Sequence, residues 1–205
     1  MYTLKKLNYL FQDLEPYIDT HTMGLHYNKH FRGYLNKLNL LLVKNKFKFQ
    51  YPLSELYFYL NSFSYDDREA IVFNLGGVLN HELYFDSLAS KVVLPAGDLE
   101  KQIVKQFGSY ETFVEKFKDV SKSLKESGYT FLEISLNGDL IINNRSNQDS
   151  PLFHGNIPLF CIDLWEHAYY INYENNRDVY LDNIFNVVSF SYANKLYENF
   201  HKNYL

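Results

Sequence analysis

The run Asp163-Leu164-Trp165-Glu166-His167-Ala168-Tyr169-Tyr170 is the feature that most constrains how this chain folds. It places two carboxylates and an imidazole among apolar and aromatic residues. Burying such groups costs several kcal/mol unless they are paired or bind a metal. An aspartate combined with a neutral imidazole suits a transition-metal ion. The run supplies only part of such a site, so the fold must bring further ligands from elsewhere.

Histidines are the first candidates for these further ligands. The chain has seven, at positions 21, 26, 30, 81, 154, 167 and 201. His26 and His30 are four residues apart in a helical pattern from 20 to 40, so both rings can project from one side of a helix. His81 lies in a second such stretch, from 68 to 89. A His-x-x-x-His pair is more often two unrelated side chains, so a purely structural helix stays open as an alternative.

Hydrophobic patterning divides the chain in two. Helices are predicted at 20–44, 53–61 and 68–89, before a connector with proline and glycine at 91–98. Helices at 99–107 and 110–126 then precede strands at 129–136, 140–143 and 157–162, and a last helical region begins at His167. We therefore predict an α+β fold. It has an N-terminal helical hairpin domain (1–90) and a C-terminal α/β domain (91–205) with a three-stranded antiparallel sheet.

Composition excludes several classes of protein. A chain of 205 residues can bury a substantial core, and its single cysteine, Cys161, excludes an internal disulfide and indicates a reducing compartment. No leader pattern and no apolar run of about 20 residues is visible, so we expect a cytoplasmic, bacterial protein outside the membrane. A net charge of −4 argues against nucleic-acid binding. Phosphate-loop, Cys-x-x-Cys and Ser-His-Asp patterns are absent.

Four motifs together resemble a known family. They are Leu25-His26-Tyr27-Asn28-Lys29-His30 followed by Tyr34, Gly76-Gly77-Val78-Leu79-Asn80-His81, Asn147-Gln148-Asp149-Ser150-Pro151-Leu152, and the run from Asp163 to Tyr170. Their order and spacing are similar to those of the iron/manganese superoxide dismutases, over essentially the whole chain. The resemblance implies that a manganese or iron ion, cycling between trivalent and divalent states, converts two superoxide anions and two protons into dioxygen and hydrogen peroxide.

The same resemblance implies roles for individual residues. The metal ligands would be His26, His81, Asp163 and His167. Tyr34 and His30 would gate the site and relay protons, and the Gln148 amide would contact the solvent molecule on the metal. Lys29 and Arg177 would attract superoxide. Trp165 would wall the cavity, while Glu166 and Tyr170 would reach His167 and His30 of the partner subunit in a homodimer; a tetramer stays open.

The sequence leaves alternatives open for the preferred metal and for the activity. Gly77 together with Gln148 resembles the manganese-type arrangement, but Tyr27 is more familiar from iron-type members, so dual-metal use stays open. Phe85, Tyr129 and Phe131 replace tryptophans that usually wall the cavity. A non-catalytic metal-binding homologue that has lost its redox tuning is therefore the second hypothesis. A structural helical protein that binds no metal is the third.

Overall fold

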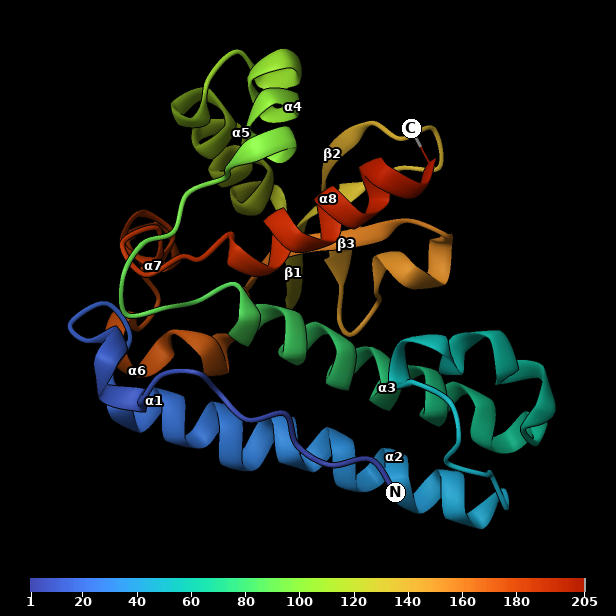
Figure 1. Cartoon of the computed structure of the whole chain (residues 1–205). Coiled ribbons are helices and arrows are strands. Elements are labelled where there is room, and N and C mark those ends of the chain that lie inside the picture. The colour runs from blue at the N-terminus through green and yellow to red at the C-terminus, as the bar shows by residue number, and fades with distance from the viewer. Residues whose placement is uncertain (205) are drawn as a thin grey trace.

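The computed structural model describes residues 1–204, and Leu205, the last residue of the second predicted domain, lies outside them (Figure 1). The helices and strands follow one another along the chain in this order: η1 (Phe11–Leu14), α1 (Thr20–Leu25), η2 (His26–Phe31), α2 (Arg32–Lys44), η3 (Leu53–Ser62), α3 (Tyr65–Asp86), α4 (Gly97–Phe107), α5 (Tyr110–Ser123), β1 (Gly128–Ile134), β2 (Leu140–Ser146), η4 (Pro151–His154), β3 (Ile157–Asp163), η5 (Glu166–Ala168), α6 (Tyr170–Tyr173), α7 (Arg177–Ile184) and α8 (Ser191–Tyr204).

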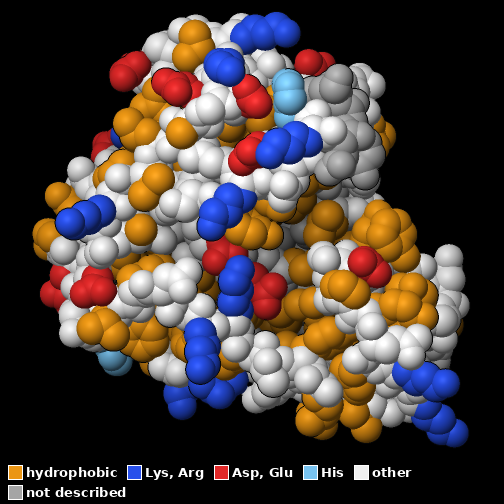
Figure 2. Space-filling view, viewed as in Figure 1, with side chains coloured by type: hydrophobic (Ala, Val, Ile, Leu, Met, Phe, Trp, Pro, Cys, Tyr) orange, Lys and Arg blue, Asp and Glu red, His pale blue; other side chains and the backbone are white. Residues whose placement is uncertain are grey.

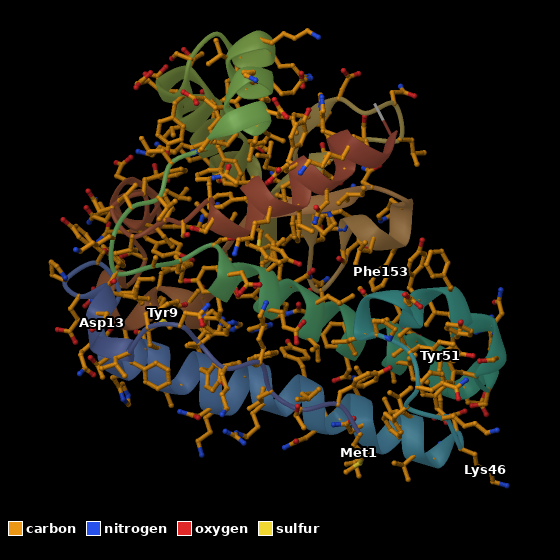
Figure 3. All side chains as sticks on the ribbon, in the orientation of Figure 1. Met1, Tyr9, Asp13, Lys46, Tyr51 and Phe153 are labelled. Atoms are coloured by element: carbon orange, nitrogen blue, oxygen red, sulfur yellow. The ribbon has the colours of Figure 1, made fainter. Side chains whose placement is uncertain are left out.

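A helical hairpin forms the N-terminal part. The long helical rod from α1 to α2 packs against α3, and the two run side by side in Figure 1. The N-terminal segment lies along this hairpin, from Met1 beside α2 to Asp13 of η1 beside α1 (Figure 3). Asn39 holds it by exchanging two hydrogen bonds with the Tyr2 backbone, at 3.0 and 2.9 Å. The hairpin is thereby tied to the chain's own N-terminal segment.

The rod contains a π-helical turn that local patterning does not reveal. The sequence predicts one continuous helix over 20–44, but η2 from His26 to Phe31 is π-helical between two α-helices. A π-turn adds a residue per turn and rotates the side chains that follow. His26 is buried at its start while His30 is exposed near its end. The two histidines of the His-x-x-x-His pair therefore have different surroundings.

The C-terminal part is built on a three-stranded antiparallel sheet with the order β2-β1-β3, and the predicted α+β fold class is confirmed. β2 extends to Ser146, three residues beyond the predicted strand. α3 packs on β3, and α8 packs on the same strand. Phe160 of β3 stacks on Phe190 with ring centroids 4.5 Å apart, whereas Cys161 faces the backbone carbonyl of Asn80 in α3. Side chains alternate along a strand, so Asp163 shares the α3-facing side with Cys161.

The surface shows no single-sign charged face in the view of Figure 2. Acidic and basic side chains lie interspersed near its middle, and hydrophobic side chains gather over the region of η3 and the start of α3. Among residues 1–204, no helix combines the length and the apolar character that crossing a membrane requires.

Candidate metal centre

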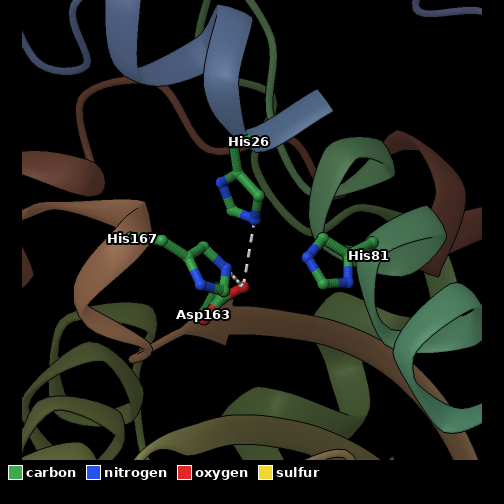
Figure 4. Close-up of side chains that lie close together, drawn as sticks. All are labelled: His26, His81, Asp163 and His167. Atoms are coloured by element: carbon green, nitrogen blue, oxygen red, sulfur yellow. Dashed lines mark ion pairs between the residues drawn. The ribbon is translucent and has the colours of Figure 1, made fainter. Parts of the chain in front are cut away.

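Four side chains from distant segments converge between the hairpin and the sheet (Figure 4). His26 comes from η2, His81 from α3, Asp163 from the end of β3 and His167 from η5. One potential ligand atom from each lies within 4.8 Å of the other three. The two hairpin helices thus supply one histidine each, and the Asp163–Tyr170 run supplies the other two groups. The structure brings together all four predicted ligands.

The atoms that face this common point lack hydrogen-bond partners in the described part of the chain. They are the Nε2 atoms of the three histidines and Oδ2 of Asp163, and all four are buried. His26 Nε2 and His167 Nε2 lie 3.2 and 3.4 Å from Asp163 Oδ2. An unsatisfied buried polar atom costs about 1–3 kcal/mol, so four together need a shared partner. Three imidazole nitrogens and a carboxylate oxygen fit one transition-metal ion.

Hydrogen bonds behind two of the ligands, His81 and Asp163, aim them at this point. His81 Nδ1 lies 2.6 Å from the Gly77 carbonyl oxygen, an acceptor, so the proton sits on Nδ1 and the Nε2 lone pair is free. The backbone N–H of Trp165 donates to Asp163 Oδ1 at 2.8 Å, which leaves Oδ2 for the site. Such supporting contacts determine ring tautomer and ligand orientation.

Burial and neighbouring groups set the charges of three of the ligands, His26, His81 and Asp163. Burial lowers the pKa of His26 to about 4 and that of His81 well below the ordinary value, so both rings are neutral at pH 7. Burial also acts to raise the Asp163 pKa, but the neighbouring rings of His167 and His26 outweigh it and hold that pKa below its usual range. Neutral imidazoles and an ionised carboxylate are the protonation states that bind a metal cation.

A hydrogen-bonded pair lies beside the ligands. Gln148 Nε2 donates to Tyr34 Oη at 3.1 Å, joining the loop after β2 to helix α2. Asn80 Nδ2 donates to the Asp149 carbonyl at 3.0 Å and so ties this loop to α3. The Tyr34 ring lies 5.3 Å from that of His81 between centroids. Tyr34 and Gln148 are therefore placed together next to the ligand cluster.

Two glycines of α3 make room for this pair. A Cβ atom at Gly76 would fall 1.9 Å from the backbone oxygen of Gln148, and one at Gly77 would fall 2.4 Å from Tyr34 Cδ1. Cβ atoms do not approach other atoms so closely. The Gly76-Gly77 motif is thus a packing requirement of the site.

Aromatic rings enclose the histidines. Phe31 lies parallel to His81 at 5.8 Å, Phe85 meets His26 edge-on at 5.1 Å, and Tyr129 meets His81 at 6.1 Å. Tyr84 stacks on His26 at 5.0 Å. Phe31, Phe85, Tyr84 and Tyr129 are all buried. Buried phenylalanine and tyrosine rings thus contact both His26 and His81, although Trp165 is the chain's only tryptophan.

A cavity of about 190 Å³ leads to Tyr34 and His30 from the surface. Its other lining residues are Lys29, Gly33, Lys37 and Phe73. The sequence analysis missed Lys37, although its position eight residues after Lys29 on the same helical rod could have indicated it. The structure does not bring Arg177 to this cavity, because its guanidinium donates a hydrogen bond to the Leu124 carbonyl.

The remaining predicted residues lie around His167. Trp165 stacks near the His167 ring at 5.7 Å and donates from Nε1 to the Asn147 carbonyl at 3.1 Å. The His30 ring stacks on His167 at 4.0 Å. Glu166 and Tyr170 are exposed in the single chain. Their side chains are thus open to a second molecule.

Comparison with known proteins assigns a family to this centre. The family model for the alpha-hairpin domain of iron/manganese superoxide dismutases matches residues 1–89, and the model for the C-terminal domain matches residues 95–196. The chain is 39% identical to the superoxide dismutase [Mn] of Listeria innocua, over 96% of this chain and 98% of that protein. It is 36% identical to the superoxide dismutase [Mn] of Pseudomonas aeruginosa, over 91% and 92% of the two chains.

A relative whose name includes both metals is almost as similar to this chain. The superoxide dismutase [Mn/Fe] of Methylomonas sp. (strain J) is 35% identical to the chain, over 96% of this chain and 98% of that protein. Matches to both domain models and to full-length relatives confirm the family prediction made from the four motifs. This chain therefore belongs to the iron/manganese superoxide dismutase family.

Proposed function

We propose that this chain is a superoxide dismutase, which converts two superoxide anions and two protons into dioxygen and hydrogen peroxide. The observation that carries the proposal is the set of four buried, unpaired ligand atoms on His26, His81, Asp163 and His167. One manganese or iron ion held there supplies a redox couple that oxidises one superoxide anion and reduces the next. No observation favours the non-catalytic alternative, because Tyr34, Gln148 and the ligands are all in place.

The chain's own residues would hold and move the protons. Gln148 Nε2 donates to the hydroxyl of Tyr34 and orients it, and Tyr34 lines the cavity. Burial raises the Tyr34 pKa above its ordinary value of 10.0, so the hydroxyl carries its proton at neutral pH. His30 lines the same cavity. Tyr34 and His30 are thus the proposed proton relay, with Gln148 as the residue that orients it.

Manganese is the favoured metal, with dual-metal use as the second candidate. The side-chain amide comes from Gln148, after β2, and the ring of Tyr34 occupies the space beside Gly77 where a longer side chain would have to lie. This supports the manganese-type arrangement. The name of the Methylomonas relative, superoxide dismutase [Mn/Fe], is the reason to keep iron in the test.

A homodimer is the proposed active form. Glu166 and Tyr170 are exposed in the single chain although they belong to the Asp163–Tyr170 run. Glu166 would accept a hydrogen bond from the partner subunit's His167, and Tyr170 would meet the partner subunit's His30. Lys29 and Lys37, which line the cavity, would attract the superoxide anion, and Arg177 would add to the positive potential from outside the cavity.

Cellular location and domain limits complete the proposal. We place the protein in the bacterial cytoplasm because its single cysteine is free and buried. As a superoxide dismutase it would act there as an antioxidant enzyme. We propose that the domains divide between residues 90 and 91, in the segment between α3 and α4 that contains Pro95.

The test is dismutase activity after separate reconstitution with manganese and with iron, with the metal per chain quantified in each sample. We expect one ion per chain and higher activity with manganese. Comparable activity with both metals would identify a dual-metal enzyme. Full metal loading without activity in either form would contradict the proposed function and support the non-catalytic alternative.

A further inference from the structure

We propose that Glu133 and Arg145 form a buried clasp that positions Gln148 beside Tyr34. This inference rests on the proposed function, in which Gln148 orients the proton relay. Glu133 lies on β1 and Arg145 on β2, three residues before Gln148. Neither belongs to the four motifs that identify the family. Both are positioning residues, because neither contacts the ligand cluster.

The first half of the clasp is a charge pair inside the sheet. Arg145 Nη2 donates to both oxygens of Glu133, at 3.1 and 3.0 Å, and Asn156 Nδ2 donates to Oε2 at 2.8 Å. The Glu133 side chain is fully buried, and only 15% of the Arg145 side chain is exposed. Two of these bonds come from one guanidinium nitrogen and the third comes from Asn156, so the carboxylate is held from both sides and the Arg145 head group is anchored more firmly than in a surface ion pair.

The second half reaches the Gln148 loop. The other terminal nitrogen of Arg145, Nη1, lies 3.9 Å from Asp149 Oδ2. Asp149 directly follows Gln148, and its side chain also accepts from the backbone N–H of Ser150 at 2.9 Å and lies 2.8 Å from His154 Nε2. The guanidinium therefore spans from a buried strand to the residue next to Gln148.

The loop needs such support because its backbone turns sharply. Asn147 has a positive φ of 55°, in the left-handed region that asparagine adopts more readily than most residues other than glycine. Asp149 N–H donates to the Ser146 carbonyl at 3.0 Å to close the turn. A displacement of this turn by 1 Å would break the 3.1 Å contact from Gln148 to Tyr34.

The Glu133–Arg145 pair acts on the position of the loop more than on the stability of the fold. Desolvation of two buried charges offsets most of their attraction, so replacing both with apolar residues of similar size often leaves stability unchanged or raises it. Removing only one partner leaves an unpaired buried charge and destabilises the fold. The single and double variants therefore separate stability from positioning, and the double variant also leaves the net charge unchanged.

The test compares three variants of the metal-loaded protein with the wild type: Arg145→Leu, the double variant Glu133→Leu with Arg145→Leu, and Asp182→Asn. The last removes an exposed ion pair with Lys118 and serves as the control. Three quantities are measured: the melting temperature, hydrogen exchange of the Asp149 amide, and the midpoint potential of the bound ion.

We expect Arg145→Leu to lower the melting temperature and the double variant to restore most of it. Exchange at Asp149 should rise about tenfold in both, because the turn opens locally, and the midpoint potential should shift in both. Asp182→Asn should leave exchange and potential unchanged. A double variant with wild-type exchange and potential would overturn the proposal. Exchange at Asp149 does not depend on turnover, so an inactive wild type would contradict the proposed function without deciding the clasp.

Discussion

Gly77 of α3 lies directly against the ring of Tyr34, where a Cβ atom would fall only 2.4 Å from Tyr34 Cδ1. The missing side chain allows the tyrosine to sit between α2 and α3 with its hydroxyl 3.1 Å from Gln148 Nε2. The neighbouring Gly76 makes the equivalent space for the backbone of Gln148. The two adjacent glycines thus leave room for Tyr34 and Gln148, which meet beside the ligand cluster.

Gly77→Ala should therefore displace the Tyr34 ring. We expect it to cost about 1–3 kcal/mol of unfolding free energy by overpacking, and to slow turnover because the contact with Gln148 lengthens. Denaturant unfolding and the dismutation rate measure the two effects. Gly24→Ala is the matched control, since a Cβ atom there meets nothing within 4 Å. Equal effects of the two substitutions would show that Gly77 is not a packing requirement.

His81→Ala should abolish tight metal binding and dismutation together. His81 is fully buried, and its Nε2 is one of the four unpaired ligand atoms. Metal per chain after reconstitution and the dismutation rate are the measurements. His21→Ala, which removes an exposed histidine of α1, should change neither. Full metal content in the His81 variant would exclude this residue as a ligand.

Gln148→Ala should keep the metal but slow turnover by about ten- to a hundredfold, as the loss of groups around a metal site does, because Tyr34 loses the donor that orients it. The pKa of Tyr34 should rise further, because burial already raises it and the hydrogen bond from Gln148 opposes that rise. Titration of labelled tyrosine by NMR checks the pKa. Gln50→Ala, at an exposed glutamine, is the control. Wild-type turnover in the Gln148 variant would refute its proposed role.

Glu166→Ala should weaken self-association. The wild type is expected to sediment at twice the chain mass of 24.4 kDa. Loss of a hydrogen-bonded charge at a buried interface costs about 2–5 kcal/mol, so the variant should dissociate at concentrations where the wild type does not. Glu100→Ala, on the exposed side of α4, should sediment like the wild type. A variant that stays dimeric would show that Glu166 does not carry the interface.

The contact between Asp67 and Lys44 predicts a pH dependence of stability. Lys44 Nζ at 2.7 Å and Asn45 Nδ2 at 2.9 Å hold the pKa of Asp67 below its ordinary value of 3.8. A carboxyl with a lowered folded-state pKa stabilises the protein above the unfolded-state pKa, and this stabilisation is lost as pH falls through the folded-state value.

The wild type should therefore lose its advantage over Asp67→Asn as pH falls below about 4. Unfolding free energies of both proteins at pH 7 and pH 3 test this. Asp66→Asn, in the same first turn of α3 but exposed, is the control for the helix dipole. A constant difference between wild type and Asp67→Asn at both pH values would contradict the prediction.

The sequence alone determined the fold class, the family and the residues of the ligand cluster. Helical and strand periodicities are local properties, so they located α3, α4 and all three strands within a few residues. The ligand set came from the motifs around His26, His81 and Asp163, whose order and spacing survive in the sequence. Those motifs do not state distances, and the approach of four ligand atoms to within 4.8 Å is a property of the folded chain.

Only the tertiary structure decided the remaining features. The π-helical turn at His26–Phe31 differs from an α-helix by one residue in its hydrogen-bonding pattern. The spacing of apolar residues does not reveal this difference. Lys37 joins the cavity, and Arg177 turns to the Leu124 carbonyl, because packing between helices directs these long side chains. Glu133 and Arg145 are twelve residues apart in the sequence and in no shared motif. The strand pairing of β1 with β2 brings them together, because hydrogen-bonded register is a relation between segments and not a property of either one.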